Sequence, residues 1–279
     1  MANNLDNFQM INMKYILSYF PVLTLLICLS VGFIDCNTSK NTQPSKNTQA
    51  AVKEEPIKET IAGLPPGYLP MEELPNSLAL IPPPPEKGSA AFALDQEYAK
   101  KAVDSTSAAR FDQAKEDADL NFPGAVKSFE SIVGFKISET KTPKLYSLMH
   151  RVLTDALLST YSAKNYYKRE RPFMVNNMPI CTPKDEAALR KDGSYPSGHA
   201  AIGWAWALLF CEFFPGKTDA VKQRGYEFGE SRVICNVHWH SDVDMGRLLG
   251  AATVDSLHTN STFSSDLASA REEVKNISQ

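Results

Sequence analysis

The clearest pattern in this sequence is a run of apolar residues at helical spacing between residues 142 and 169. Positions three and four apart share one face of a helix, so these residues would form an apolar stripe. The stripe consists of Leu145, Leu148, Val152, Leu153, Ala156 and Leu157. Thr142 and Pro143 suit a helix start, and Pro172 should end the segment because the residue before a proline disfavours helical geometry. The pattern predicts one helix over residues 142–169.

Helical periodicity continues on both sides of this segment. It predicts further helices over residues 90–105, 107–120, 199–214, 218–235 and 241–260. The segment 199–214 is apolar nearly all round, which indicates a buried helix, and it is short for a membrane span. No alternating strand pattern of useful length and no repeat is visible. The sequence predicts an all-α fold, a single helical domain packed around this buried central apolar helix.

The N-terminal part has a different character. Residues 36–63 are polar and lack the apolar side chains to form a core, so we expect a flexible linker. Residues 64–85 are rich in proline, which forbids a regular helix and favours an extended arm lying on the domain. The predicted organisation is a signal peptide or membrane anchor over residues 1–35, the linker, and a catalytic domain over residues 64–279.

The first of these segments predicts export from the cytoplasm. Residues 15–34 carry no charge and follow Lys14, a pattern typical of a secretory signal peptide, with a single membrane anchor as the alternative. Met13 is a second candidate for the start of translation. Cys36 follows the apolar run as in bacterial lipoproteins, although Asp35 stands where such signals usually carry a small residue. We expect a periplasmic or otherwise exported protein, with lipid attachment through Cys36 left open.

Composition narrows the function only a little. The chain has 279 residues, of which 43% are hydrophobic and 22% charged, as is ordinary for a globular protein. The net charge of -3 gives no bulk argument for binding nucleic acid or an anionic membrane. Cys181, Cys211 and Cys235 permit at most one disulfide within the domain, and Cys181 with Cys235 is one candidate pair. No CxxC motif is present, so we expect no structural zinc site.

The stretch GSYPSGHAAIGWAWALLF places polar residues at the mouth of the predicted buried helix. A helix start leaves backbone N–H groups unpaired and carries partial positive charge, so it can bind a phosphate oxygen. Ser197 can cap the helix or donate its hydroxyl, Gly198 would let an anion approach, and His199 would lie in the first turn. Taken by itself, this motif is better explained by an ordinary helix cap with a satisfied histidine.

Two further clusters favour the anion. Lys164 and Arg171 are seven positions apart, close to two helical turns, so both cations should project from one face. Arg232 offers a planar guanidinium suited to phosphate oxygens. If the segment from His238 is helical, Asp242 faces it one turn later, fixes its tautomer and leaves the other ring nitrogen free to attack.

In this order, Lys-x6-Arg-Pro, Pro-Ser-Gly-His and Ser-Arg-x5-His-x3-Asp resemble the three-part signature of the type 2 phosphatidic acid phosphatase superfamily. The segments PPPPEKGSAAFALDQ, YSAKNYYKRERPF, DGSYPSGHAAIGWAWAL and RGYEFGESRVICNVHWHSDVD are similar to the class A bacterial non-specific acid phosphatases. The resemblance covers about residues 64–265. It implies an all-α fold of the acid phosphatase and vanadium haloperoxidase kind, no metal or other cofactor, and hydrolysis of phosphomonoesters with broad specificity.

The resemblance also implies residue roles. His238 would be the nucleophile that forms a phosphohistidine, Asp242 would orient it, and His199 would protonate the leaving alcohol and then activate water. The implied phosphate ligands are Lys164, Arg171, Ser197, Gly198 and Arg232. The expected partners are phosphomonoesters, inorganic phosphate and further copies of the chain in a homo-oligomer, while phosphate transfer to alcohols stays open. A neutral nucleophile and a protonated acid predict a bell-shaped rate profile with an optimum below pH 7.

Two departures from the family pattern border the expected pocket. His240 stands where relatives often carry glutamine, and Leu153 and Thr154 occupy a region where they tend to carry acidic residues. These changes bear on substrate preference and pH optimum.

Four alternatives remain at this point. A metal hydrolase could use His199, His238, His240 and Asp242 as ligands. That interpretation gives no function to the cations Lys164, Arg171 and Arg232. A vanadium-dependent haloperoxidase shares the three-part motif. An integral-membrane lipid phosphatase would need more membrane spans than residues 15–34 supply. A phosphate-binding protein would need no nucleophile.

Overall fold

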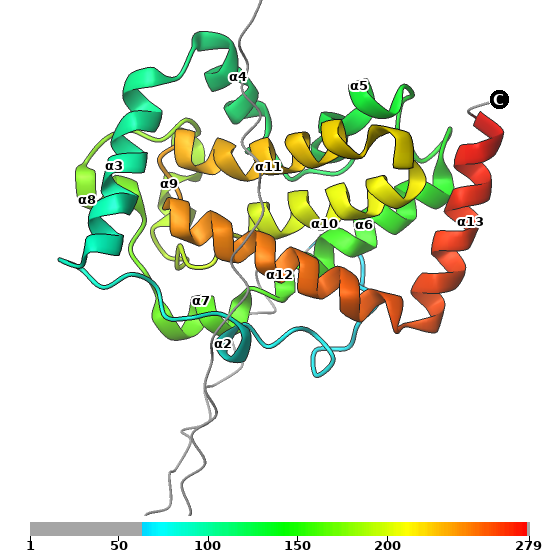
Figure 1. Cartoon of the computed structure of the whole chain (residues 1–279), viewed down its shortest axis with the longest axis horizontal. Helices are drawn as coiled ribbons and strands as arrows, with labels where there is room; N and C mark the ends of the chain where they lie inside the picture. The colour runs from blue at the N-terminus through cyan, green and yellow to red at the C-terminus, as the bar shows by residue number, and fades with distance from the viewer. Residues whose placement is uncertain (1–62, 278–279) are drawn as a thin grey trace, which may run out of the picture. The chain divides into compact units, whose positions relative to one another are not determined.

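A computed structural model describes residues 63–277 of the chain. The predicted signal peptide or anchor, nearly all of the predicted linker, and Cys36 lie outside the described residues. Within them the fold is all-α, and no strand occurs among residues 63–277 (Figure 1). The longer helices are α3 (Ala90–Ser105), α4 (Ala108–Glu116), α6 (Pro143–Leu158), α10 (Gly198–Phe213), α11 (Thr218–Ile234), α12 (His240–His258) and α13 (Ser261–Ile277). The shorter ones are α2 (Ser77–Leu80), α5 (Glu130–Val133), α7 (Tyr161–Tyr167), α8 (Pro172–Asn176) and α9 (Glu186–Leu189), with 3-10 turns η1 (Ala125–Phe129), η2 (Pro183–Asp185) and η3 (Pro215–Lys217).

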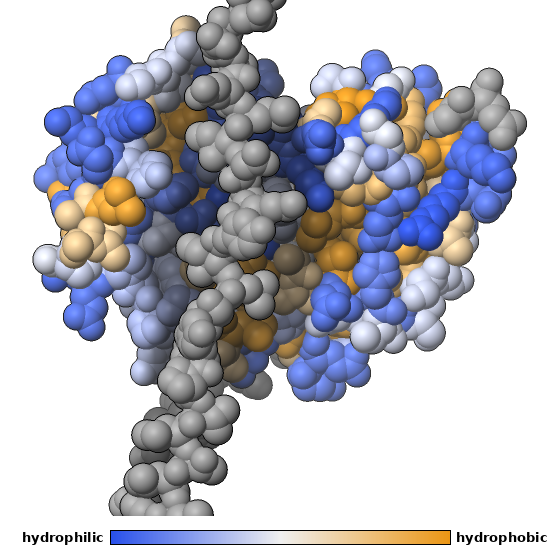
Figure 2. Space-filling view, in the orientation of Figure 1, coloured by the Kyte–Doolittle hydropathy of each residue, from blue (hydrophilic) through white to orange (hydrophobic). Residues whose placement is uncertain are grey.

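The apolar helix predicted from the sequence is α10, and it forms the centre of the fold. It packs against α6, α11 and α12, which surround it in Figure 1. Most of its side chains are buried, and the indole of Trp206 donates to the carbonyl of Met149 at 2.9 Å. Hydrophilic residues cover much of the outward side of α13 (Figure 2). The prediction of a buried central helix is confirmed.

The prediction of one helix over residues 142–169 is wrong, because the structure divides this segment into α6 and α7. The hydroxyl of Ser159 donates to the carbonyl of Ala156 at 2.8 Å, and that of Thr160 donates to Leu157 at 2.7 Å. Hydroxyl groups that bond to nearby carbonyls compete with the helical ladder, so α6 ends here. The apolar periodicity continued across the break and concealed it.

The helix α13 was not predicted. Its buried side chains, Phe263, Leu267, Ala270 and Val274, do follow helical spacing and pack into the main core. Residues 107–120 form a shorter helix than expected, since α4 ends at Glu116. The other helices agree with their predicted ranges to within two residues at each end.

The proline-rich arm contains one helical turn, α2, and is otherwise without helix up to α3. It is fixed to α6 by the buried carboxylate of Asp155, which accepts the backbone N–H groups of Tyr68 at 2.8 Å and Leu69 at 3.2 Å. Thr154 also donates to the carbonyl of Pro65 at 2.9 Å. Among the described helices, none has the length and apolar character needed to cross a membrane.

Candidate active site

The three motifs found in the sequence meet at one place in the fold. The backbone N–H of Ser197 donates to the carbonyl of Asp242 at 2.9 Å, which joins the start of α10 to the start of α12. Arg171 joins the remaining motif to them, because its Nη1 donates to the carbonyl of Val237 at 2.9 Å. The same Nη1 lies 3.1 Å from Nε2 of His238. Segments more than sixty positions apart in sequence therefore contribute to one site.

His238 lies just before α12 rather than inside a helix. The prediction that His238 and Asp242 face each other across a helical turn is wrong in its geometry, since α12 begins at His240. The contact nevertheless exists, because Asp242 occupies the first turn and reaches back, with Oδ2 at 3.3 Å from Nδ1 of His238. A carboxylate only accepts, so Nδ1 carries the hydrogen and Nε2 presents its lone pair.

Asp242 is fully buried and uses both carboxylate oxygens. Oδ2 also accepts the backbone N–H of Trp239 at 2.8 Å, and Oδ1 accepts from Nη1 of Arg169 at 2.5 Å. Burial raises the pKa of the Asp242 carboxyl above its usual range, whereas the Arg169 guanidinium opposes that rise. Burial, with the Arg171 guanidinium second, holds the pKa of His238 well below its usual range, so its imidazole is neutral.

His199 lies in the first turn of α10, as predicted. Its Nε2 is 3.1 Å from the carbonyl oxygen of Ala118, and because a carbonyl can only accept, Nε2 carries the hydrogen. Nδ1 is therefore the ring nitrogen left for chemistry. Burial, and next the positive charge of Arg232, hold the pKa of His199 well below its usual range.

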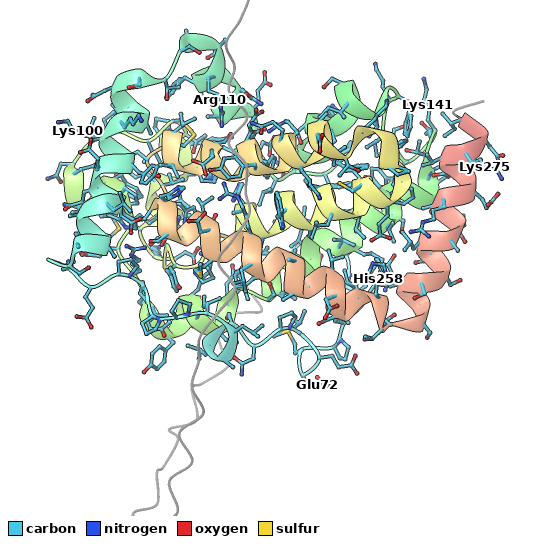
Figure 3. All side chains as sticks on the ribbon, in the orientation of Figure 1. Glu72, Lys100, Arg110, Lys141, His258 and Lys275 are labelled. Carbon is cyan, nitrogen blue, oxygen red and sulfur yellow. A yellow bond between two sulfur atoms is a disulfide. The ribbon has the colours of Figure 1, made fainter. Side chains whose placement is uncertain are left out.

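The carbonyl that holds His199 belongs to a segment fixed tightly to α11. Asp117, one residue earlier, accepts from the hydroxyl of Ser231 at 2.5 Å and pairs with Arg224. Arg110, labelled in Figure 3, reaches from α4 to the same Ser231 hydroxyl at 3.0 Å. The end of α4 therefore positions the second histidine of the site.

Lys164 and Arg171 converge, but not through a shared helical face. The helix α7 ends at Tyr167, Lys168 adopts a left-handed conformation, and Arg171 is extended at the start of α8. That prediction is therefore wrong. The two cations meet through Asp192, whose Oδ2 lies 3.3 Å from Nζ of Lys164 and 2.9 Å from Nη2 of Arg171.

Arg232 differs from the other two cations. Its side chain is almost fully buried, and its Nε and Nη1 atoms have no hydrogen-bond partner within residues 63–277. Burial lowers the pKa of the guanidinium to about 9, so it remains charged at acid and neutral pH. A buried guanidinium with unmatched donors is suited to binding an anion, since buried polar groups are normally paired.

Ser197 is the residue that caps α10, and its hydroxyl accepts the N–H of Ala200 at 3.3 Å. Gly198 follows it, and a β-carbon there would lie 2.7 Å from Cδ1 of Leu157. A side chain at position 198 would therefore require Leu157 on α6 to move. The prediction that this glycine opens the way for an anion is not needed to account for it.

A cavity of about 590 Å³ opens on His199 and Arg232. Apolar residues form about half of its lining, and charged and polar residues form the rest. The apolar lining residues are Leu64, Ala118, Leu120, Leu153, Leu157, Ala188 and Leu189, and the others are Lys115, Asp119, Asn121, Thr182, Lys184 and Asp185. Leu153, one of the two departures from the family pattern, is thus part of this wall.

His240, the other departure, faces a different set of groups. Its ring stacks on Tyr98 with centroids 4.0 Å apart, and its Nε2 lies 3.4 Å from Oδ2 of Asp244.

No group of three or more histidine, cysteine or acidic side chains in the described part of the chain is arranged to hold a metal ion.

Sequence reasoning missed four residues that shape this site. They are Asp95, Ala118, Arg169 and Asp192. Arg169 lies inside the Lys-x6-Arg-Pro motif, and Asp95 and Asp192 lie in segments similar to the acid phosphatases, but no spacing marked these three as site residues. Their contacts with the site are long-range, and spacing in the sequence does not reveal such contacts.

Cys181 and Cys235 form a disulfide, which sequence analysis had left as one candidate pair. The bridge joins the segment after α8 to the end of α11, only three residues before His238. Cys211 is free.

Comparison with known proteins identifies the family of this chain. Residues 145–262 match the model of the PAP2 superfamily. The chain is 42% identical to the non-specific acid phosphatase of Providencia stuartii over 223 residues, which are 76% of this chain and 90% of that protein. It is 43% identical to the non-specific acid phosphatase of Salmonella typhimurium over 204 residues, 73% of this chain and 82% of the relative. A solved bacterial vanadium-dependent iodoperoxidase aligns with a TM-score of 0.48 and 17% identity, covering 64% of this chain and 52% of that one.

The chain therefore belongs to the PAP2 superfamily. Within that superfamily, it is a member of the bacterial non-specific acid phosphatases.

Proposed function

We propose that this protein is a metal-independent acid phosphatase that hydrolyses phosphomonoesters through a phosphohistidine on His238. The observation that carries the proposal is the position of the His238 imidazole, with Nδ1 3.3 Å from Oδ2 of Asp242 and Nε2 3.1 Å from Nη1 of Arg171. The names of the relatives support the same reaction class. Export is part of the proposal, and the Cys181–Cys235 disulfide supports an oxidising compartment.

In the first step, the Nε2 lone pair of His238 attacks phosphorus and the bond from phosphorus to the ester oxygen breaks. The hydrogen stays on Nδ1, hydrogen-bonded to Asp242, whose negative charge stabilises the positive charge that develops on the ring. Arg171, with Nη1 3.1 Å from Nε2, and Arg232, with its unmatched donors, stabilise the phosphoryl oxygens. Such charge stabilisation is the main requirement of phosphoryl transfer.

As the ester bond breaks, His199 donates a proton from Nδ1 to the departing alcohol oxygen. In the second step a water takes the place of the alcohol, gives a proton to Nδ1 of His199, and attacks phosphorus so that the phosphorus–nitrogen bond breaks. Burial and Arg232 disfavour protonation of His199. A phosphate dianion beside the ring opposes both effects and raises its pKa. We therefore expect an optimum below pH 7, where a substrate-bound His199 is protonated and His238 is neutral.

The leaving group would occupy the cavity beside His199. Its leucine-rich wall, which includes Leu120, Leu153 and Leu157, favours esters whose alcohol carries an aromatic or alkyl group. Alcohols that enter the same cavity in place of water would accept the phosphoryl group, giving phosphate transfer. Lipid attachment at Cys36 and the homo-oligomeric state stay predictions.

The experiment compares wild type with His238→Ala on p-nitrophenyl phosphate and glycerol phosphate between pH 4 and pH 9, with and without EDTA. We expect the variant to lose turnover while still binding inorganic phosphate, and wild-type activity to survive EDTA. Acid-labile phosphate trapped on His238 would identify the intermediate. Normal turnover by His238→Ala, or a rate optimum near pH 9, would overturn the proposed mechanism.

A further inference from the structure

Arg169 occupies a position between the catalytic carboxylate and the outer helix α3. Its side chain is 8% exposed and lies among three aromatic rings, those of Phe92, Tyr195 and Trp239. The guanidinium carbon is 5.5 Å from the Trp239 ring, the nearest of them. A charge in such surroundings is retained only when its donors are matched, so its partners indicate its task.

Those partners tie Arg169 to the carboxylate that orients the nucleophile. Nη1 donates to Oδ1 of Asp242 at 2.5 Å and to the hydroxyl of Ser241 at 2.8 Å. The other oxygen of Asp242 accepts from His238 and from the Trp239 backbone. The plane of the carboxylate is therefore fixed from both sides, by Arg169 on one and by the histidine segment on the other.

Asp95 on α3 holds Arg169 in place. Its Oδ2 accepts from Nη2 of Arg169 at 2.7 Å and from the Ser241 hydroxyl at 2.6 Å, while Oδ1 accepts the Ser241 backbone N–H at 2.9 Å. Asp95 is itself buried and precedes the residues that match the superfamily model. The start of α12, including Asp242, is thus anchored to α3 through Asp95 and Arg169.

We propose that Arg169, held by Asp95, is a positioning residue that keeps Asp242 ionised and directed at Nδ1 of His238. This inference rests on the proposed phosphohistidine function. Without the guanidinium, the buried carboxyl would retain a proton more readily and could donate it to Nδ1. His238 would then carry its hydrogen on Nε2, the nitrogen that must attack.

The charges around Asp242 set the direction of the effect. The charged and titratable groups that face it are Lys164, Arg169, Arg171, Tyr195 and His238, with Asp95 behind Arg169. Arg169 is the nearest full positive charge, in direct contact with Asp242. Its removal raises the pKa of Asp242, because the carboxylate loses its nearest cation. A raised pKa of Asp242 moves the acid limb of the rate profile to higher pH.

The test uses Arg169→Gln and Arg169→Lys, assayed for kcat, KM and inhibition by inorganic phosphate across pH. We expect Arg169→Gln to lower kcat by about 10- to 100-fold, the range that applies to groups orienting metal-bound imidazoles. Its acid limb should move up by about one pH unit, while the inhibition constant for phosphate stays unchanged. Arg169→Lys retains the positive charge, so its acid limb should lie close to the pH of the wild-type acid limb.

Arg247→Gln is the matched control. Arg247 is also nearly buried and bridges two carboxylates, Glu230 and Asp244, but it touches neither His238 nor Asp242. It should lose stability without a shift of the acid limb. If wild type turns over, His238→Ala does not, and Arg169→Gln keeps the wild-type acid limb, the inference is wrong and the proposed function stands. If His238→Ala still turns over, the proposed function itself fails.

Discussion

Replacing Arg232 by methionine should stabilise the fold and at the same time remove phosphate binding. The Arg232 side chain is 3% exposed, and its Nε and Nη1 atoms lack a partner within the described residues. A buried donor left unmatched costs about 1–3 kcal/mol, and methionine fills similar space without donors. We therefore expect the free energy of unfolding to rise by about 1–3 kcal/mol, or about 2–4 °C in Tm for each kcal/mol.

Arg224→Met provides the control on the same helix, α11. Arg224 is 9% exposed, but its donors are matched, by the carboxylate of Asp117 and by the carbonyl of Ser128 at 3.0 Å. Breaking a buried ion pair by removing one partner costs about 3–5 kcal/mol. The two substitutions of arginine by methionine should therefore change stability in opposite directions.

The assay is urea or thermal unfolding with and without inorganic phosphate, together with kcat/KM on p-nitrophenyl phosphate. A ligand present at 100 times its Kd stabilises a protein by about 2.7 kcal/mol, so phosphate should raise the Tm of wild type but not of Arg232→Met. The variant should lose about 10²- to 10³-fold in kcat/KM. The reasoning would be refuted if Arg232→Met were destabilised as much as Arg224→Met. It would also be refuted if phosphate raised the Tm of Arg232→Met as much as that of wild type.

Three further predictions concern the frame of the site. Gly246→Ala should lower Tm and kcat together, with a stability loss of about 1–3 kcal/mol, because its added carbon would overlap the carbonyl oxygen of Ser197 and force α12 from α10. Reduction of the Cys181–Cys235 bridge, which spans 54 positions, should lower the free energy of urea unfolding by about 2–4 kcal/mol, and an unchanged midpoint would contradict this. Burial raises the pKa of Asp155 to about 6, so the folded state binds a proton at Asp155 more readily than the unfolded chain does. As the pH falls from 7 to 4, the free energy of unfolding of wild type should therefore rise by about 2 kcal/mol relative to that of Asp155→Asn. A stability difference independent of pH would show that Asp155 does not titrate as described.

Much of the fold was predictable because helical periodicity is a local property of the chain. The bounds of α3 agree with the prediction at both ends, and the apolar character of residues 199–214 identified the central helix before any coordinates. The break between α6 and α7 was not predictable in this way. It depends on the hydroxyls of Ser159 and Thr160 bonding to carbonyls, while the apolar pattern runs through them unchanged.

The candidate site, like the fold, was predictable from the sequence only in part. The residue types were present in the sequence, since His199, Arg232, His238 and Asp242 lie in motifs whose chemistry suits a phosphate. The route by which they meet was not, because Asp242 reaches His238 from the first turn of α12 rather than across a shared helix.

The sequence by itself determined the helical class of this protein, its buried central helix and the side chains available for chemistry, since these follow from spacing and residue type. Only the tertiary structure decided which donors are matched. Lys164 and Arg171 share Asp192, whereas Arg232 is left with free donors. That distinction depends on which distant groups pack against each cation, and chain-local patterns carry no information about such contacts.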